Sequence, residues 1–409
     1  DSTIDAVKMV TTVATNALLE RKGAPTALLT QAGLEDLLLV GDQTRPALFD
    51  LRARRPAPLA VTARGLGARL GATGEVLAAL DLAELRRTLE DLRGAGIEAL
   101  AIALLHADRF PELEATIADE ARRFGFLQVT ASHEVSAEAG LLARAQTAVV
   151  DAYLTPGLQG YVVSLEARLE RCRVRWMTSA GALVEGARFR GRDAVLSGPA
   201  GGVVALGAVA RQAEVHAVLG LDMGGTSTDV SRVAGEPERL HELEVAGVRL
   251  RAPAVAVHTI AAGGGSLLRV EAGRLHVGPE SAGAVPGPLA YGHASAHTPA
   301  LTDAAVVLGR VQAGRFPFAL DTGRARAGLA RLAEAAGITG PDAAERAAEG
   351  FLAVATASMA EAIEQVSVAQ GHDARRHALV LFGGAAGQYG CAVAERLGVR
   401  EVLAHPQAG

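Results

Sequence analysis

The first third of the chain alternates two patterns of apolar residues. Residues 81–96 and 111–125 carry apolar side chains every three or four positions and end in glycine, which predicts two helices. Residues 97–107, IEALAIALLHA, form a nearly continuous apolar run of the kind found in strands buried on both faces of a parallel sheet. The alternation of strand and helix predicts an α/β unit that extends to about residue 135.

A long helical stretch follows over residues 136–172, and beyond it the chain is rich in glycine clusters. Most clusters come directly after an apolar, strand-like run; they lie at 178–181, 196–203, 221–229, 260–266, 277–288 and 381–390. Glycine accepts left-handed backbone angles and lets a backbone approach a ligand closely. A plain turn is the alternative at each single cluster, but the six together predict a large nucleotide or phosphate site.

The stretch GLDMGGTSTDVSRV, residues 220–233, predicts a strand, a glycine turn and a second strand. Its turn would point N–H groups inward as a nest for an anion, with hydroxyl groups beside them. The residues concerned are Gly224, Gly225, Thr226, Ser227 and Thr228. Asp222 and Asp229 would repel a phosphate and instead fit beside a Mg²⁺ ion. A carboxylate at the strand end would alternatively orient an attacking hydroxyl or water, and an ordinary tight hairpin is the remaining alternative.

Three further stretches add candidate residues. HTIAAGGGS ends a strand with Gly263, Gly264 and Gly265, and it places His258 beside them as a candidate catalytic residue. LFGGAAGQYG follows the strand HALVLF and precedes a helix, so Gly383 and Gly384 suit an adenosine platform, with a plain βα turn as the alternative. Asp303 in LTDAAVVLGR is either a metal ligand or the N-cap of a helix. The chain has no GxxxxGK[ST] phosphate loop, and a strand rather than a helix follows the 224–227 turn, which excludes a Rossmann motif.

Composition narrows the class of protein. Hydrophobic residues make up 49% and charged residues 21% of the 409, which is typical of a folded globular chain. A formal net charge of −5 disfavours nucleic-acid or anionic-membrane partners, and the one tight basic cluster, around Arg52, Arg54 and Arg55, is expected on a solvated loop. No run approaches the about 18 uncharged apolar residues of a membrane span, and no secretion signal is visible. Two widely separated cysteines favour a reducing, cytoplasmic location.

Taken in order, the motifs resemble the hydantoinase A/5-oxoprolinase family, which also includes subunits of acetone and acetophenone carboxylases. The resemblance runs from about residue 8 to residue 409. The matching stretches are TTVATNALLERKG, GDQTRPALFDL, DAYLTP, LSGPAGGVV, LDMGGTSTDVSR, HTIAAGGGS, VGPESAGAVPGP, LTDAAVVLGR and FGGAAGQYGCAVAERLG.

The resemblance implies an α/β fold of the actin-like ATPase type, related to ribonuclease H, sugar kinases and heat-shock chaperones, in which two hairpins clasp the ATP phosphates. Residues 220–233 match the second hairpin, and the first would precede Asp1. A chain that opens without methionine and stops after a strand is therefore expected to be trimmed at both ends. The implied domains are an N-terminal region, 1–135, and a core, 136–409.

The implied function is ATP-dependent hydrolysis of a cyclic amide such as 5-oxoproline or a hydantoin, with ATP and Mg²⁺ bound by this chain. A hydantoinase B-like subunit or fused half would open the ring, in an oligomeric assembly. The alternatives are a subunit of an ATP-dependent ketone carboxylase, and a nucleotide-binding module without turnover.

Overall fold

A computed structural model describes residues 4–44, 49 and 56–408. The chain forms two compact units. Unit 1 is Asp1–Gly201 with Arg239–Val255, and unit 2 is Gly202–Glu238 with Ala256–Gly409. The domain limit expected at residue 135 lies inside unit 1, so the compact units divide the chain differently. The cluster of Arg52, Arg54 and Arg55 lies outside the described residues.

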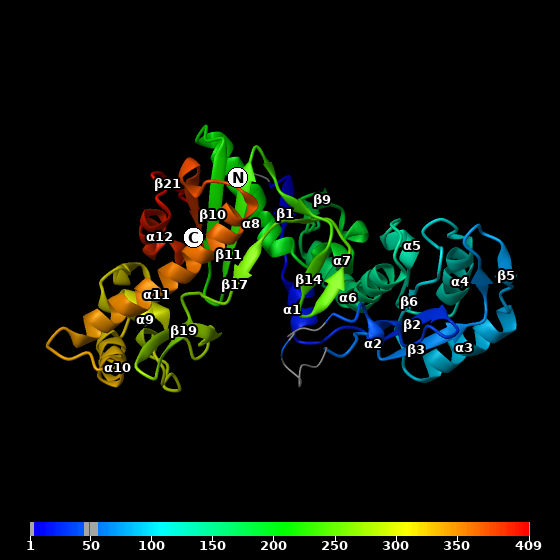
Figure 1. Cartoon of the computed structure of the whole chain (residues 1–409), viewed down its shortest axis with the longest axis horizontal. Helices are drawn as coiled ribbons and strands as arrows, with labels where there is room; N and C mark the ends of the chain where they lie inside the picture. Colours follow the sequence, from blue (N-terminus) through cyan, green and yellow to red (C-terminus); the bar gives the residue numbers. More distant parts are fainter. Residues whose placement is uncertain (1–3, 45–48, 50–55, 409) are drawn as a thin grey trace. The chain divides into compact units, whose positions relative to one another are not determined.

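The first part of unit 1 is a four-stranded parallel sheet with helices packed on it (Figure 1). Its strands, in spatial order, are β3 (Thr62–Leu66), β2 (Thr26–Gln31), β6 (Ala99–Ile102) and β7 (Gln128–Ala131). The helices α3 (Leu82–Gly94) and α4 (Glu112–Arg123) are the two that the apolar spacing predicts. Every residue of β2 and β6 is buried, as expected for central strands of a parallel sheet. The α/β prediction is therefore confirmed.

The centre of unit 1 is the 28-residue helix α6 (Leu141–Arg168), which accounts for most of the predicted helical stretch. It packs against β6 and β7, and against α1 (Val13–Leu19), α5 (Ser132–Val135) and α7 (Gly191–Ala194). A second sheet joins β1 (Ala6–Met9), β8 (Arg173–Met177) and β9 (Leu183–Val184). Smaller elements of this unit are α2 (Leu37–Val40), β4 (Arg69–Leu70), β5 (Val76–Ala78), β13 (Arg239–Leu240), β14 (Leu243–Val245), β15 (Val248–Leu250) and β16 (Ala254–Val255).

Unit 2 is built on a six-stranded sheet. Its order is β12 (Glu236–Pro237), β11 (Thr228–Ala234), β10 (Ala217–Met223), β20 (Ala378–Phe382) and β21 (Val402–Ala404), and β17 (His258–Ile260) also pairs with β11. β10 and β11 are the predicted antiparallel hairpin, whereas β10, β20 and β21 run parallel. The hairpin of β18 (Ser266–Glu271) and β19 (Arg274–Ser281) forms a separate small sheet.

Helices pack on this sheet to form one large apolar core. They are α9 (Leu301–Val307), α10 (Thr322–Ala335), α11 (Ala343–Gln365) and α12 (Gly390–Leu397). The helix α8 (Ser197–Gln212) begins in unit 1 and continues into unit 2. By length and composition alone, residues 343–370 would be long and apolar enough to cross a membrane. Phe351, Met359 and Ile363 of this segment are buried in the core, which is the packing of an internal helix.

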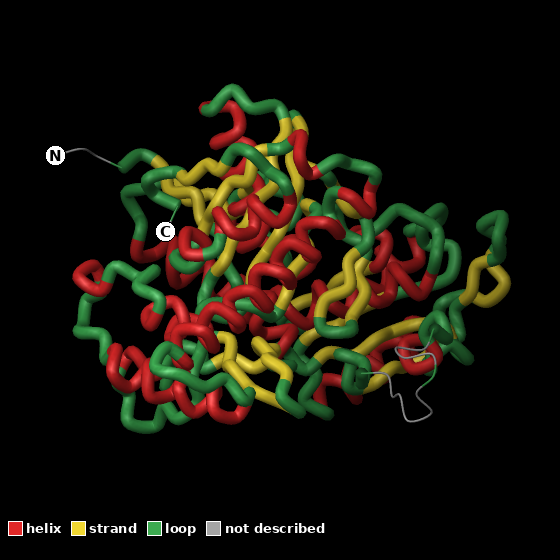
Figure 2. The backbone as a smooth tube through the Cα atoms, turned by 60° about the vertical axis from the view of Figure 1, so that its left-hand side comes forward, coloured by secondary structure: helices red, strands yellow, loops and turns green. Residues whose placement is uncertain are grey.

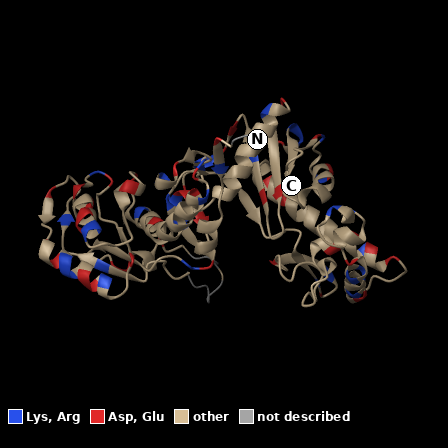
Figure 3. Ribbon diagram, turned by 180° about the vertical axis from the view of Figure 1, so that it is seen from behind, with Lys and Arg blue, Asp and Glu red and all other residues tan. Residues whose placement is uncertain are grey.

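Strands and helices are mixed throughout both units, and so are the charges. Figure 2 shows strands bordered by helices along the backbone. In Figure 3 the Lys and Arg positions are interspersed with Asp and Glu along the ribbons. Many of them are paired at the surface, for example Arg122 with Asp119 and Arg375 with Asp373. The charge distribution thus agrees with the low net charge of the sequence.

Candidate functional site

The glycine turn between β10 and β11 lies at the carboxyl end of β10. The hairpin register pairs Met223 with Thr228 and Asp222 with Asp229, so residues 224–227 form the turn. The N–H of Gly224 donates to the carbonyl of Ser227 at 3.1 Å. Within the described residues, the N–H groups of Gly225, Thr226 and Ser227 have no protein acceptor. Three successive free N–H groups in a turn form the anion nest that the sequence predicts.

The triple glycine packs directly against this turn. The N–H groups of Gly264 and Gly265 donate to the carbonyls of Gly224 and Gly225, at 3.0 and 2.6 Å. A Cβ on Gly263 would lie 2.7 Å from the backbone of Gly225, a distance that real side chains do not adopt. Because their N–H groups and close contacts are used inside the protein, these glycines brace the turn. Their direct contact with a nucleotide stays a prediction.

A third glycine segment approaches the end of β10 from β20. The N–H of Ala385 donates to the carbonyl of Met223 at 3.2 Å, which ties the segment after β20 to the hairpin. Gly383 has a φ of +79°, and a Cβ there would contact the carbonyl oxygen of Met223 and lie 2.7 Å from Asp222 Oδ1. Gly384 has open space around it. The structure therefore brings the predicted 224–227, 263–265 and 383–384 glycines together at one end of the sheet.

Asp222 and Asp229 face the same side of the hairpin because they are register partners. Burial raises the pKa of both carboxyl groups above the ordinary value, and the charge of Asp229 raises the pKa of Asp222 further. Thr259 Oγ1 donates to Asp229 Oδ1 at 2.6 Å, which partly offsets the burial. In the described part of the chain, Asp222 has no side-chain hydrogen bond or ion pair. Two adjacent, partly buried carboxylates without a cationic side chain are a donor set that suits a divalent cation.

Asp303 has a structural position. It is fully buried, and its oxygens accept the N–H groups of Leu289, Ala290 and Ala300 at 3.0, 2.7 and 2.7 Å. It lies in the first turn of α9, whose N-cap is Ala300, so the expectation that Asp303 is itself the N-cap is wrong. Three backbone donors already satisfy this carboxylate, and its role as a metal ligand stays a prediction. Across the described residues, no group of three or more His, Cys, Asp or Glu is placed to hold a metal ion.

His258 lies next to the site in sequence but not on the same face. Its register partner is Val230, a fully buried core residue, whereas Asp229 pairs with Thr259. Successive residues of a strand point to opposite faces, so His258 projects away from the side that carries Asp222 and Asp229. The side chain is exposed, and no hydrogen bond ties it to the described residues. Its catalytic role stays a prediction that this register does not favour.

Several hydroxyl groups support the site. Only Thr228 was singled out from the sequence, as a donor beside the anion nest, and that expectation is wrong because its hydroxyl is used inside the protein. Thr228 Oγ1 donates to the carbonyl of Ala262, and Ser266 Oγ accepts the N–H of Gly263 at 2.8 Å. Thr302 donates both its N–H and its hydroxyl to the carbonyl of Gly264, each at 2.7 Å. Thr228 and Ser266 stand within or at the end of a glycine cluster, which was the available signal, whereas Thr302 stands in LTDAAVVLGR, outside the clusters. Thr259 was inside a quoted motif as well.

Comparison with known proteins agrees with this arrangement. The fold matches the crystal structure of the ATP-dependent caprolactamase from Pseudomonas jessenii, with a TM-score of 0.85 and 31% identity over 99% of this chain and 60% of that one. It also matches a nucleotide-free acetone carboxylase, with a TM-score of 0.79 and 23% identity over 97% of this chain and 59% of that one. These likenesses define a two-unit α/β protein of a known architecture.

The hydantoinase/oxoprolinase family matches residues 144–409, and the hydantoinase/oxoprolinase N-terminal region matches residues 1–125. The chain therefore belongs to the hydantoinase/oxoprolinase family, and the resemblance seen in its motifs is confirmed. 5-Oxoprolinase 1 of Arabidopsis thaliana is 38% identical over 99% of this chain and 35% of its own length. The chain thus spans about a third of the length of that relative.

Proposed function

We propose that this chain carries out the ATP-dependent step in the hydrolysis of a cyclic amide, of the 5-oxoproline or hydantoin type. The observation that carries the proposal is the free N–H nest of the 224–227 turn beside two unneutralised carboxylates, Asp222 and Asp229. Membership of the family and the likeness to an ATP-dependent caprolactamase support it. We infer the actin-like ATPase fold for unit 2, which the antiparallel hairpin continued by parallel strands supports.

The nest would hold phosphate oxygens of ATP through the N–H groups of Gly225, Thr226 and Ser227. Thr226 and Ser227 also have hydroxyl groups that bond to no described residue, and these would add donors. The fixed N–H groups need no reorganisation when charge develops on the transferred phosphoryl group. Gly384, with open space around it, would lie under the adenosine, and Gly383 would keep the segment close to Asp222.

The carboxylates of Asp222 and Asp229 would hold Mg²⁺, directly or through water. When bound, the ion would neutralise charge on the phosphates. Asp222 is the residue that we infer to orient the attacking amide by accepting its N–H, because the Asp222 carboxylate has no partner among the described residues and lies at the end of β10.

The chemistry explains why an amide hydrolase would use ATP. An unstrained amide resists water because resonance stabilises its carbonyl group. In the proposed step the amide oxygen attacks the γ-phosphorus, the bond to the leaving oxygen of ADP breaks, and ADP departs with that electron pair. Transfer of the N–H proton to water leaves an imidate phosphate whose carbon is open to attack by water. The protein would contribute positioning and charge stabilisation.

Ring opening would need a hydantoinase B-like subunit or fused half, because the glycine site accounts only for the phosphoryl transfer. We propose a cytoplasmic, oligomeric assembly of this kind. Because the chain spans only part of its relatives, the test uses the full-length protein together with its partner.

The test measures ADP release with 5-oxoproline, hydantoin and acetone in turn. We expect 5-oxoproline or hydantoin to stimulate ADP release and acetone to have no effect. Stimulation by acetone alone would replace the proposal with a ketone carboxylase subunit. If no compound stimulates ADP release, a nucleotide-binding module without turnover is the better description.

A further inference from the structure

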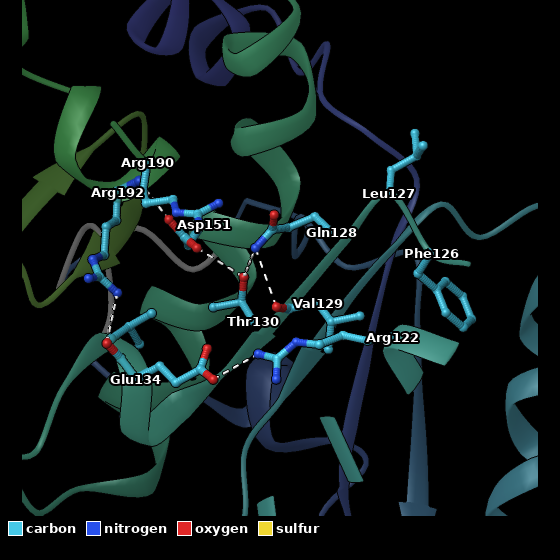
Figure 4. A pocket seen from close by; sticks show the side chains of 11 residues that line it. Arg122, Phe126, Leu127, Gln128, Val129, Thr130, Glu134, Asp151, Arg190 and Arg192 are labelled. Carbon is cyan, nitrogen blue, oxygen red and sulfur yellow. Dashed lines mark hydrogen bonds and ion pairs between the residues drawn. The ribbon is translucent and has the colours of Figure 1, made fainter. Parts of the chain in front are cut away.

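Unit 1 contains a cavity that the proposed function does not use. It has a volume of about 390 Å³ and lies between β7, α6 and the segment that leads into α7. Figure 4 shows polar side chains from these elements converging on it. The polar groups that matter for its chemistry are Arg122, Thr130, Glu134, Asp151, Arg190 and Arg192. The volume is in the range of pockets that hold small molecules.

The segment that carries two of the arginines is clamped onto α6. Asp151 Oδ1 accepts the N–H of Arg192 at 3.2 Å, and Thr155 Oγ1 accepts the N–H of Gly191 at 3.0 Å. A Cβ on Gly191 would lie 2.7 Å from the Cβ of Leu154, so the segment rests directly on the helix. Asp151, Leu154 and Thr155 belong to the DAYLTP motif, which the ATP site does not explain. In this structure the DAYLTP motif fixes the backbone between Arg190 and Arg192.

Two buried residues that line the cavity, Asp151 and Thr130, are also held in place by hydrogen bonds. Asp151 is 3% exposed and Thr130 is 2% exposed, and Thr130 Oγ1 donates to Asp151 Oδ2 at 2.9 Å. Thr130 lies on β7, the edge strand of the sheet, where alternate peptide groups have no strand partner. A ligand would therefore meet fixed polar groups on this side.

The three arginines differ in what neutralises them. Arg122 forms ion pairs with Asp119 and Glu134, at 3.0 and 2.8 Å. Arg192 lies 3.5 Å from Asp193 and donates to the carbonyl of Glu134 at 3.2 Å. Arg190 is only partly exposed, yet its guanidinium group has no hydrogen bond or ion pair with any described residue. The two carboxylates that line the cavity are engaged elsewhere, because Glu134 pairs with Arg122 and Asp151 accepts from Thr130 and from the N–H of Arg192. The half-buried Arg190, on a clamped backbone, therefore lacks a counter-charge.

We propose that this cavity binds a small molecule through a carboxylate group, with Arg190 as its principal anchor. The guanidinium group offers two parallel N–H donors that match the two oxygens of a carboxylate. One unpaired arginine balances one negative charge, which favours a carboxylate over a phosphate dianion. The proposal does not depend on ATP turnover, because every residue that it uses lies in unit 1 and none belongs to the glycine site.

Isothermal titration calorimetry without ATP tests the proposal on the full-length protein. The probes are 5-oxoproline and L-glutamate as carboxylates, neutral hydantoin, and inorganic phosphate. We expect at least one carboxylate to bind, and Arg190→Gln to weaken that binding about 10-fold or more, the scale of a lost charge-assisted pair. Arg188→Gln is the matched control, because Arg188 is exposed, lies two residues away and does not line the cavity.

Arg190 has no partner to lose, so the melting temperature of Arg190→Gln should stay close to that of the wild type and separate lost binding from misfolding. Equal carboxylate binding by wild type and Arg190→Gln would overturn the proposal. So would binding of phosphate or hydantoin without binding of either carboxylate. A proportional loss in Arg188→Gln would show that net surface charge, and not the cavity, is responsible.

Discussion

Asp222 is a residue whose position costs stability. Burial and the neighbouring Asp229 raise its pKa, which means that the folded protein binds a proton there more tightly than the unfolded chain does. The penalty grows as pH rises from the ordinary carboxyl pKa through the raised one, and it is fully present above the raised value. We therefore predict that Asp222→Asn has a melting temperature at pH 7 equal to or above that of the wild type.

The same substitution should lower turnover by about 10²-fold or more, the scale of losing a positioned group in the transition state. ADP release by the full-length protein with its partner measures this, alongside thermal unfolding. Asp91→Asn, on the exposed face of α3, is the matched control and should change neither property. Turnover close to the wild type in Asp222→Asn would remove Asp222 from the mechanism.

Gly383 and Gly384 are adjacent in sequence but differ in whether a side chain would fit. Alanine at Gly383 would adopt a left-handed φ and press its Cβ against Met223 and Asp222, whereas alanine at Gly384 would meet open space. We predict that Gly383→Ala lowers the free energy of unfolding by about 1–3 kcal/mol, the cost of a strained backbone position. Gly384→Ala should stay within about 0.5 kcal/mol of the wild type, as measured by urea unfolding. Equal losses in both variants would contradict the close packing of Gly383.

Between elements, a buried carboxylate joins α4 to the segment after β6 and to α5, and through Ser132 to α6. Glu114 is fully buried, accepts the N–H of Leu104 and the hydroxyl of Ser132, each at 2.7 Å, and pairs with His133 Nδ1 at 2.8 Å. Arg144 of α6 donates to the same serine hydroxyl at 3.1 Å. The hydrogen bond to Glu114 is the main cause that raises the pKa of His133, with a smaller contribution from Glu134 and opposition from burial and from Arg122.

This pair makes stability depend on pH. A histidine whose folded pKa is raised stabilises the protein fully below its unfolded pKa, about 6.5, and the contribution is lost as pH rises through the folded value. We predict that the melting temperature falls between pH 6 and pH 8.5 and that His133→Gln reduces this slope. His276→Gln, at an exposed position on β19, should leave the slope unchanged. An identical slope in wild type and His133→Gln would show that the pair does not titrate in this range.

Local elements were the most predictable part of the structure. Helices α3 and α4, strand β6 and the β10–β11 hairpin follow from apolar spacing and turn residues close in sequence. The stretch TTVATNALLERKG, with Thr and Asn near its start and Gly23 behind it, predicts a helix that ends at the glycine, and this prediction is wrong. The helix ends at Leu19, and the left-handed residue is Arg21. Gly23 instead lies against the ring of Tyr153, a tertiary contact more than a hundred residues away in sequence.

The residue types of the candidate site were predictable from the sequence. Which residues offer free N–H groups and which brace the turn was not. The sequence places glycines at 224–225, 263–265 and 383–384 without showing which of them keep free N–H groups. The structure separates them, because Gly264 and Gly265 donate to the turn and the turn itself keeps its donors. His258 shows the same limit, since only the β11–β17 register reveals which face it occupies. Contacts between segments that are distant in sequence decide which glycine N–H groups stay free and which face His258 occupies. The pattern of residues within one strand does not contain this information.

At the scale of the whole molecule, the chain divides its chemistry between two compact units. The glycine site lies in unit 2, and the arginine-lined cavity lies in unit 1. A ligand that binds only the folded protein stabilises it by mass action. Binding at either site should therefore raise the melting temperature separately. ATP should stabilise the protein by binding the glycine site, and a carboxylate should do so by binding the arginine-lined cavity.

Removal of the metal gives the sharpest test of the first site. In the full-length protein, we predict that ATP with Mg²⁺ raises the melting temperature and that a chelator removes most of this effect, because Asp222 and Asp229 then face the phosphates without a cation. At a ligand concentration about 100 times Kd the stabilisation is about 2.7 kcal/mol. In the double variant Asp222→Asn, Asp229→Asn, repulsion is gone, and ATP should stabilise to the same extent with or without Mg²⁺. Differential scanning fluorimetry over a series of ATP concentrations measures both. A double variant that still requires Mg²⁺ would assign the ion to other residues.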